Sequence, residues 1–123
     1  MSELRDRIRQ VIEGEDVAVF MKGTPQFVMC GNSHRALEAL RSVGAPVTAV
    51  DVLPHPEIRQ ELSGLSGWPT IPQVFVRGEL IGGADIVEEL NETGELAERL
   101  RASLGADYAT GEERVVDVLA AAS

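Results

Sequence analysis

Apolar residues follow two patterns along the chain, helical spacing in some stretches and short continuous runs in others. Helical spacing predicts helices over residues 2–14 and 31–43, and Gly44 stands where the second helix needs a left-handed cap. The run DVAVFM at 16–21 predicts a buried strand, and the β-branched run PVTAVDV at 46–52 predicts another. Because a crossover helix joins these two strands, they should be parallel.

The second half of the chain predicts a short helix, a hairpin and one or two closing helices. The stretch LPHPEIRQELSGLSG holds the short helix, with Pro56 near its start. The runs QVFV and ELI are separated by Arg77 and Gly78, which is typical of a hairpin. The closing stretch ADIVEELNETGELAERLRASL begins with Asp85 followed by Glu88, a spacing that predicts a capping box.

This order of elements predicts an α/β fold in which a four-stranded mixed sheet is flanked by helices on both faces. The length of 123 residues is enough for one modest core. One domain is expected over residues 1–104. Residues 105–123 are expected to form a C-terminal tail, either as a loose helix or disordered, with no chemistry of its own.

The chain carries 20 acidic against 11 basic residues, a formal net charge of −9. Phosphate backbones dominate nucleic-acid affinity, so this balance argues against a general DNA- or RNA-binding protein, and equally against binding to an anionic membrane. No apolar run approaches the ~20 residues of a membrane-spanning helix, and the first residues lack the apolar core of a secretory signal. With one cysteine and hence no disulfide framework, we expect a cytoplasmic location.

Cys30 is the only cysteine, and it stands immediately before the second predicted helix. The free N–H groups of Gly31, Asn32 and Ser33 should point toward its sulfur, and Lys22 adds a positive charge in the same region. Both features lower the pKa of a thiol, and the thiolate is the form that acts as nucleophile or metal ligand. The alternative is a buried structural cysteine, since free cysteines are often buried.

Ser33 stands where redox proteins often carry a second cysteine, three positions after the first. Without a second thiol the chain cannot resolve a mixed disulfide by itself, so resolution must come from an outside thiol. An iron–sulfur cluster usually needs four thiolate ligands, which two chains and two small-molecule thiols would supply. His34 and His55 show no metal-ligand spacing to Cys30.

Four motifs recur together in one known family: MKGTP at 21–25, CGNS at 30–33, DVLPHPEIRQEL at 51–62 and WPTIPQVFVRGELIGGADI at 68–86. In this order and spacing they resemble the monothiol glutaredoxins, and the resemblance runs from Leu4 to Leu104. It implies a thioredoxin-like fold, in agreement with the order of elements above.

The resemblance also implies a glutathione site. Lys22 and Arg59 match the basic residues that reach the glycine carboxylate of glutathione. Ile71 matches the residue whose backbone pairs with the cysteinyl part of the ligand. Pro72 matches a cis proline, which spacing alone would not have suggested, since only ~5–6% of X–Pro bonds are cis.

The same resemblance places the γ-glutamyl end of glutathione at the start of the closing helices. Ala84 and Asp85 match positions that hold it through backbone N–H groups and the Asp85 carboxylate, and Gly83 would let the chain approach the ligand closely. The family motif is Cys-Gly-Phe-Ser, and Asn32 replaces its phenylalanine here. This change either admits water to a cluster or donates a hydrogen bond to sulfur, and the sequence leaves both open.

As a function, the resemblance implies a homodimer that bridges a [2Fe–2S] cluster through Cys30 and one glutathione from each protomer. The cluster would pass to iron–sulfur acceptor or assembly proteins. The alternative is a weak glutathione-dependent oxidoreductase, in which Cys30 is the sole nucleophile for deglutathionylation. A third hypothesis, resting on Asn32 alone, is an adaptor that has lost both chemistries. In a host that lacks glutathione, the ligand would be another low-molecular-weight thiol.

Overall fold

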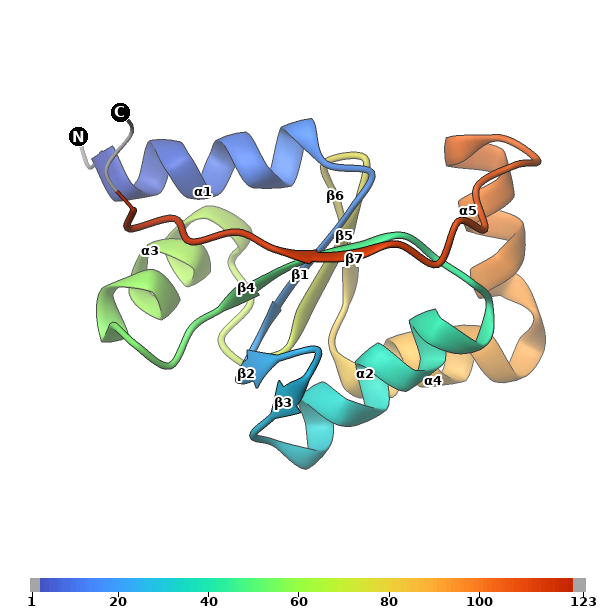
Figure 1. The fold of residues 1–123 in the computed structure, drawn as a ribbon, viewed down its shortest axis with the longest axis horizontal. Helices are drawn as coiled ribbons and strands as arrows, with labels where there is room; N and C mark the ends of the chain where they lie inside the picture. Colours follow the sequence, from blue (N-terminus) through green and yellow to red (C-terminus); the bar gives the residue numbers. More distant parts are fainter. Residues whose placement is uncertain (1–2, 121–123) are drawn as a thin grey trace.

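The main sheet lies between two layers of helices in the computed structural model, which describes residues 3–120 (Figure 1). The helices are α1 (Glu3–Gly14), α2 (Gly31–Ser42), α3 (Pro56–Ser66), α4 (Ala84–Thr93) and α5 (Glu95–Leu104). The strands are β1 (Val17–Met21), β2 (Gly23–Thr24), β3 (Phe27–Val28), β4 (Val47–Asp51), β5 (Gln73–Val76), β6 (Glu79–Gly82) and β7 (Glu113–Val115). The predicted α/β fold is confirmed. No helix within residues 3–120 is long and apolar enough to cross a membrane.

The main sheet has the strand order β6–β5–β1–β4–β7. β1 and β4 are parallel, as the crossover predicts, and β1 pairs antiparallel with β5. β5 and β6 form the predicted hairpin, in which Arg77 and Gly78 adopt positive φ values of 49° and 85°. Two consecutive positive φ values are typical of the tight turn that matches the twist of a hairpin. β2 and β3 form a separate small sheet just before Cys30.

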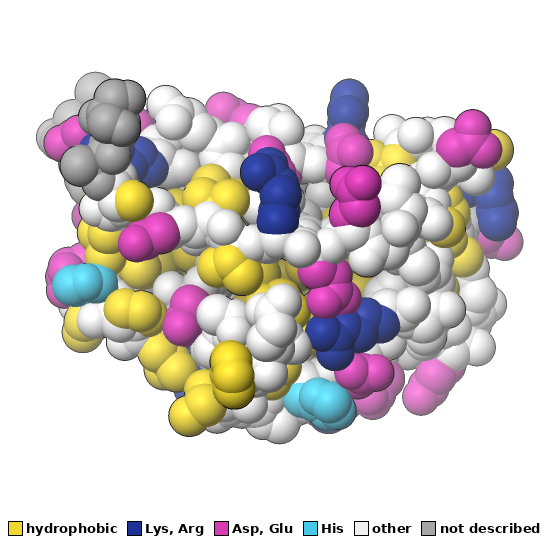
Figure 2. Space-filling model, viewed as in Figure 1, with side chains coloured by type: hydrophobic (Ala, Val, Ile, Leu, Met, Phe, Trp, Pro, Cys, Tyr) yellow, Lys and Arg dark blue, Asp and Glu magenta, His cyan; other side chains and the backbone are white. Residues whose placement is uncertain are grey.

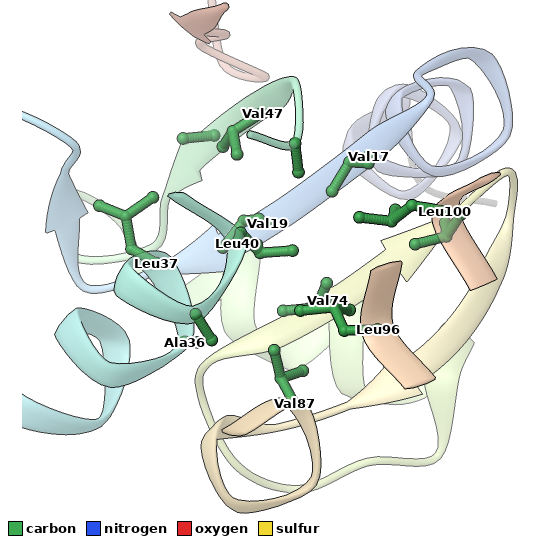
Figure 3. Close-up of a cluster of buried hydrophobic side chains, with 14 of the residues drawn as sticks. Val17, Val19, Ala36, Leu37, Leu40, Val47, Val74, Val87, Leu96 and Leu100 are labelled. Carbon is green, nitrogen blue, oxygen red and sulfur yellow. The ribbon is translucent and has the colours of Figure 1, made fainter. Parts of the chain in front are cut away.

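Alternate side chains of β1 face the two helical layers and so divide the core in two. On one face, Val17 and Val19 pack with the apolar sides of α2, α4 and α5 (Figure 3). On the other face, Ala18 and Phe20 pack with α1 and α3. Phe20 and Phe75 meet edge to face there, with ring centroids 5.8 Å apart. The two cores hold the carboxyl end of β1 beside the start of α2, where the candidate site lies.

The tail is part of the sheet, which corrects the expectation of four strands and of a helical or disordered tail. β7 runs parallel to β4 along its outer edge, and the Val116 N–H donates to the Ala49 carbonyl at 2.9 Å. Tyr108 and Val118 bury their side chains in the two cores. A strand of three residues carries little hydrophobic pattern, and its partner is distant in sequence, so periodicity does not reveal it.

The start of α4 differs from the predicted capping box. Gly83 precedes the helix, and no side chain caps its first turn. Asp85 and Glu88 instead bind Arg35 of α2, at 2.8 and 2.7 Å. The reason is tertiary, because α2 and α4 pack side by side and bring the guanidinium to these carboxylates (Figure 1). The closing stretch forms two helices, which part at Gly94 with a φ of 84°.

Candidate functional site

Cys30 is the residue immediately before α2, with an extended backbone (φ −152°, ψ 134°) and a partly exposed side chain. The pKa of its thiol is lowered, first by the hydrogen bond from the Ser33 N–H and then by those from the Asn32 N–H and the Ser33 hydroxyl. The positive charge of Lys22 adds to this lowering of the pKa, whereas partial burial opposes it. The prediction of an ionisable thiol at a helix start is confirmed, and the buried structural alternative is wrong.

Ser33 connects the end of β1 to the start of α2. Its side chain is fully buried, and its Oγ accepts a hydrogen bond from the Lys22 N–H at 3.0 Å. The same hydroxyl contributes to the lowered pKa of the Cys30 thiol. Ser33 therefore ties the backbone at the end of β1 to the start of α2 and helps to lower the pKa of the neighbouring thiol.

Two open hollows contain the residues of the predicted glutathione site. The first has a volume of about 460 Å³ and is lined by five of the predicted site residues: Ile71, Pro72, Gly83, Ala84 and Asp85. The second has a volume of about 530 Å³ and is lined by the other two, Lys22 and Arg59. Asn32 lines the first hollow, Lys22 lines the second, and both act on the sulfur of Cys30. Cys30 itself lines neither hollow, but a neighbour that lowers its pKa lines each of them.

The segment 68–70 separates the two hollows, since Trp68 and Thr70 line the first and Pro69 lines the second. Gln73, fully buried at the start of β5, donates from Nε2 to the carbonyls of Trp68 and Thr70 at 2.9 and 3.1 Å. Arg59 Nη2 donates to the Pro69 carbonyl at 3.4 Å. Gln73 therefore anchors the wall that both hollows share.

The peptide bond between Ile71 and Pro72 is cis, as the resemblance implies. Gly83 packs against this turn of the chain. A Cβ at Gly83 would lie 3.2 Å from the Pro72 carbonyl oxygen and 3.4 Å from Trp68 Nε1, so a side chain there would crowd both groups. The small size of Gly83 therefore serves protein packing, and its close approach to a ligand stays a prediction.

The surface around the site is partly apolar. Phe27, at the start of β3, and Met29, just after it, are 76% and 67% exposed. Figure 2 shows hydrophobic side chains at the surface over this region, next to scattered charged groups. Within residues 3–120, no group of three or more His, Cys, Asp or Glu side chains could hold a metal ion.

Comparison with known proteins agrees with this geometry. A protein-family model described as Glutaredoxin matches residues 17–81. Glutaredoxin 4 of Pasteurella multocida is 45% identical over 106 residues, which cover 86% of this chain and 96% of the relative. A ycf64-like monothiol glutaredoxin of Synechocystis sp. is 46% identical over 102 residues, which cover 83% and 95%. The chain belongs to the monothiol glutaredoxin family.

Solved glutaredoxin structures share the fold of this monothiol glutaredoxin. The solution structure of reduced poplar apo GrxS14 is 38% identical and matches with a TM-score of 0.73, covering 82% of this chain and 93% of that chain. The crystal structure of a buckwheat glutaredoxin–glutathione complex is 25% identical and matches with a TM-score of 0.71, covering 81% and 89%. The thioredoxin-like architecture predicted from the motifs is therefore confirmed.

Three residues of this glutaredoxin site were not predicted from the sequence: Arg35, Gln73 and Glu88. Arg35 Nη1 donates to Asn32 Oδ1 at 3.2 Å, and the spacing of three residues on one helix is a signal for that contact. The contacts of Arg35 with α4 have no local signal, because they depend on how two helices pack. A glutamine inside the apolar run after Pro72 is a weak signal of a buried, hydrogen-bonded amide.

Proposed function

We propose that this monothiol glutaredoxin binds glutathione and, as a homodimer, holds a [2Fe–2S] cluster between two protomers for transfer to iron–sulfur acceptor or assembly proteins. The observation that carries the proposal is a single thiol of lowered pKa whose neighbours Asn32 and Lys22 each line one of two hollows of unlike chemistry. Glutathione has a carboxylate at one end and both an ammonium and a carboxylate at the other. Its two ends therefore suit the two hollows.

The residues on the two sides match these ends. Lys22 and Arg59 offer two cations for the glycine carboxylate. At the other end, the first turn of α4 has N–H groups that no side chain caps, which favour a carboxylate, and Asp85 offers an acceptor for the ammonium. Ile71, which lines the first hollow, would pair its backbone with the cysteinyl residue. The glutathione complex of a buckwheat relative supports this choice of ligand.

The donor set fits a [2Fe–2S] cluster when two chains and two glutathione molecules combine. Cys30 is the one cysteine of the chain, so each protomer would contribute this thiolate and one bound glutathione, giving four thiolates. The cluster, when bound, supplies iron and sulfide as the cargo of transfer. The N–H groups of Asn32 and Ser33 lower the pKa of the Cys30 thiol, which favours the thiolate that would bind iron, and bound glutathione would bring its own thiol beside it.

Anaerobic reconstitution with iron, sulfide and glutathione tests this proposal. We expect a dimer with visible absorption and two iron atoms, measured by mass and metal analysis. A Cys30→Ser variant should stay a colourless monomer, and an Arg59→Met variant should need more glutathione to reach the same absorption. A colourless wild-type monomer, under conditions that load another monothiol glutaredoxin, would contradict the proposal.

The lowered pKa of Cys30 also favours a second function, deglutathionylation. The Cys30 thiolate would attack the glutathione sulfur of a protein–glutathione disulfide, form a new S–S bond, and release the protein thiolate. A second glutathione thiolate would then attack that glutathione sulfur, release glutathione disulfide and regenerate the Cys30 thiolate. Turnover of a glutathionylated peptide tests this function, and a rate no higher than that of Cys30→Ser would refute it. For either function we propose a cytoplasmic location.

A further inference from the structure

Arg35 connects the two walls of the first hollow. It projects from α2 and donates to Asn32 Oδ1 at 3.2 Å and to Asp85 Oδ1 at 2.8 Å. Both partners line the hollow. Glu88, further along α4, accepts from Arg35 through both carboxylate oxygens, at 3.1 and 2.7 Å. A two-pronged pair of this kind is directional, so Glu88 holds the guanidinium in place beside Asp85.

The Asp85 carboxylate already has a cationic partner at the position where the ligand's ammonium is expected. Its side chain is 90% exposed, so a ligand can reach it. One of its oxygens nevertheless accepts from a guanidinium, and Glu88 keeps that guanidinium from moving away. An ammonium bound to Asp85 would therefore lie next to a second positive charge, which weakens its binding.

We propose that Arg35 is a specificity-determining residue. It lowers the preference of the first hollow for thiol ligands whose far end carries an ammonium group. This inference rests on the proposed glutathione site. The same positive charge favours a carboxylate in the first hollow. The ligand class is therefore broader than glutathione alone and includes low-molecular-weight thiols whose far end is acylated or carries only negative charge.

The chain provides a matched control on the same helix. Arg41, near the end of α2, also binds two carboxylates, with Glu38 at 3.0 Å and Glu113 at 2.7 Å. It lines neither hollow. Replacing Arg35 or Arg41 by methionine removes one charge and two ion pairs from α2 in each case, but only the first change alters the surroundings of Asp85.

The test measures binding of S-methylglutathione and of its N-acetylated form by titration calorimetry. Acetylation removes the ammonium charge. The dissociation constant of the acetylated form divided by that of S-methylglutathione therefore measures the preference for an ammonium. We expect Arg35→Met to raise this ratio about two- to fivefold, the range typical of one exposed ion pair. Arg41→Met should leave the ratio unchanged. Glu88→Gln should also raise it, because the guanidinium is then no longer held in place beside Asp85.

The outcomes separate this inference from the function on which it rests. Equal ratios in wild type, Arg35→Met and Glu88→Gln, with S-methylglutathione bound normally, would overturn the role of Arg35 and leave the glutathione site intact. Wild-type protein that binds neither compound would overturn the proposed function and this inference with it. Thermal unfolding of each variant verifies that it is folded, and Glu88→Gln tests the inference if Arg35→Met does not fold.

Discussion

Replacing Gln73 by methionine should weaken ligand binding while leaving the stability of the fold almost unchanged. Gln73 is fully buried, and methionine has nearly the same shape without polar hydrogens. The change removes the hydrogen bonds to the carbonyls of Trp68 and Thr70, which hold the wall shared by the two hollows. Glutathione would then have to order this segment when it binds.

The expected magnitudes follow from these contacts. Two lost hydrogen bonds cost about 1–3 kcal/mol of unfolding free energy. The Oε1 of Gln73 is buried without a protein partner, and its removal relieves a penalty of about 1–3 kcal/mol. The two effects nearly cancel, so stability should change by less than about 1 kcal/mol. Ordering the backbone of one freed residue costs about 1–2 kcal/mol, which raises the glutathione dissociation constant about five- to thirtyfold.

Urea denaturation and titration calorimetry on the same preparation give the two quantities. Gln10→Met, on the exposed side of α1, is the matched control and should change neither of them. Unaltered glutathione affinity in Gln73→Met, together with a stability loss of several kcal/mol, would refute the reasoning. That result would make Gln73 a residue of the core alone, with no part in shaping the binding surface.

Three further predictions concern the thiol, the tail and pH. Ser33→Ala removes the hydroxyl that helps to lower the pKa of the Cys30 thiol, so this pKa should rise. The midpoint of the pH profile for alkylation by iodoacetamide should then move to higher pH. The hydrogen bond from Arg41 lowers the pKa of Glu113, so their pair stabilises the fold above about pH 4.5 and loses this effect as pH falls through the lower folded value. Glu113→Gln should therefore cost about 0.5–1 kcal/mol at pH 7 and less at pH 3, measured by urea denaturation. Val118→Ala should lower the unfolding free energy by roughly 1–3 kcal/mol in the same assay, because Val118 is only 3% exposed.

Each of these has a result that would count against it. An unchanged alkylation profile in Ser33→Ala would mean that the backbone N–H groups alone set the thiol pKa. An equal cost of Glu113→Gln at both pH values would mean that the ion pair has no part in stability. Full stability in Val118→Ala would mean that the tail does not pack on the sheet.

Local pattern was sufficient to predict most of the elements and the chemistry of the thiol. Alternation and helical spacing act over a few residues, so the βαβ unit and the hairpin at Arg77 and Gly78 could be predicted without knowledge of the fold. The activation of Cys30 is also local, since its main hydrogen bonds come from Asn32 and Ser33 in the first turn of the helix it precedes. The absence of a second cysteine at Ser33 was likewise evident from the residues alone.

Family motifs, rather than hydrophobic periodicity, predicted which distant residues share a site with this thiol. Lys22, Arg59 and Asp85 lie far apart along the chain, and nothing in their local sequence relates them. The motifs predicted that they share one site, and the structure places Asp85 in one hollow and Lys22 and Arg59 in another. It also shows that the wall between the hollows is anchored by Gln73, whose hydrogen bonds no motif describes.

Only the tertiary structure decided the features that depend on how separate elements pack. β7 forms because β4 has a free edge and the tail is long enough to reach it, so three residues with no clear pattern become a strand. Asp85 and Glu88 have the spacing of a capping box, yet they bind Arg35 because α2 packs against α4. In both cases the short-range pattern is compatible with several partners. The partner is decided by a surface that another part of the chain brings into contact.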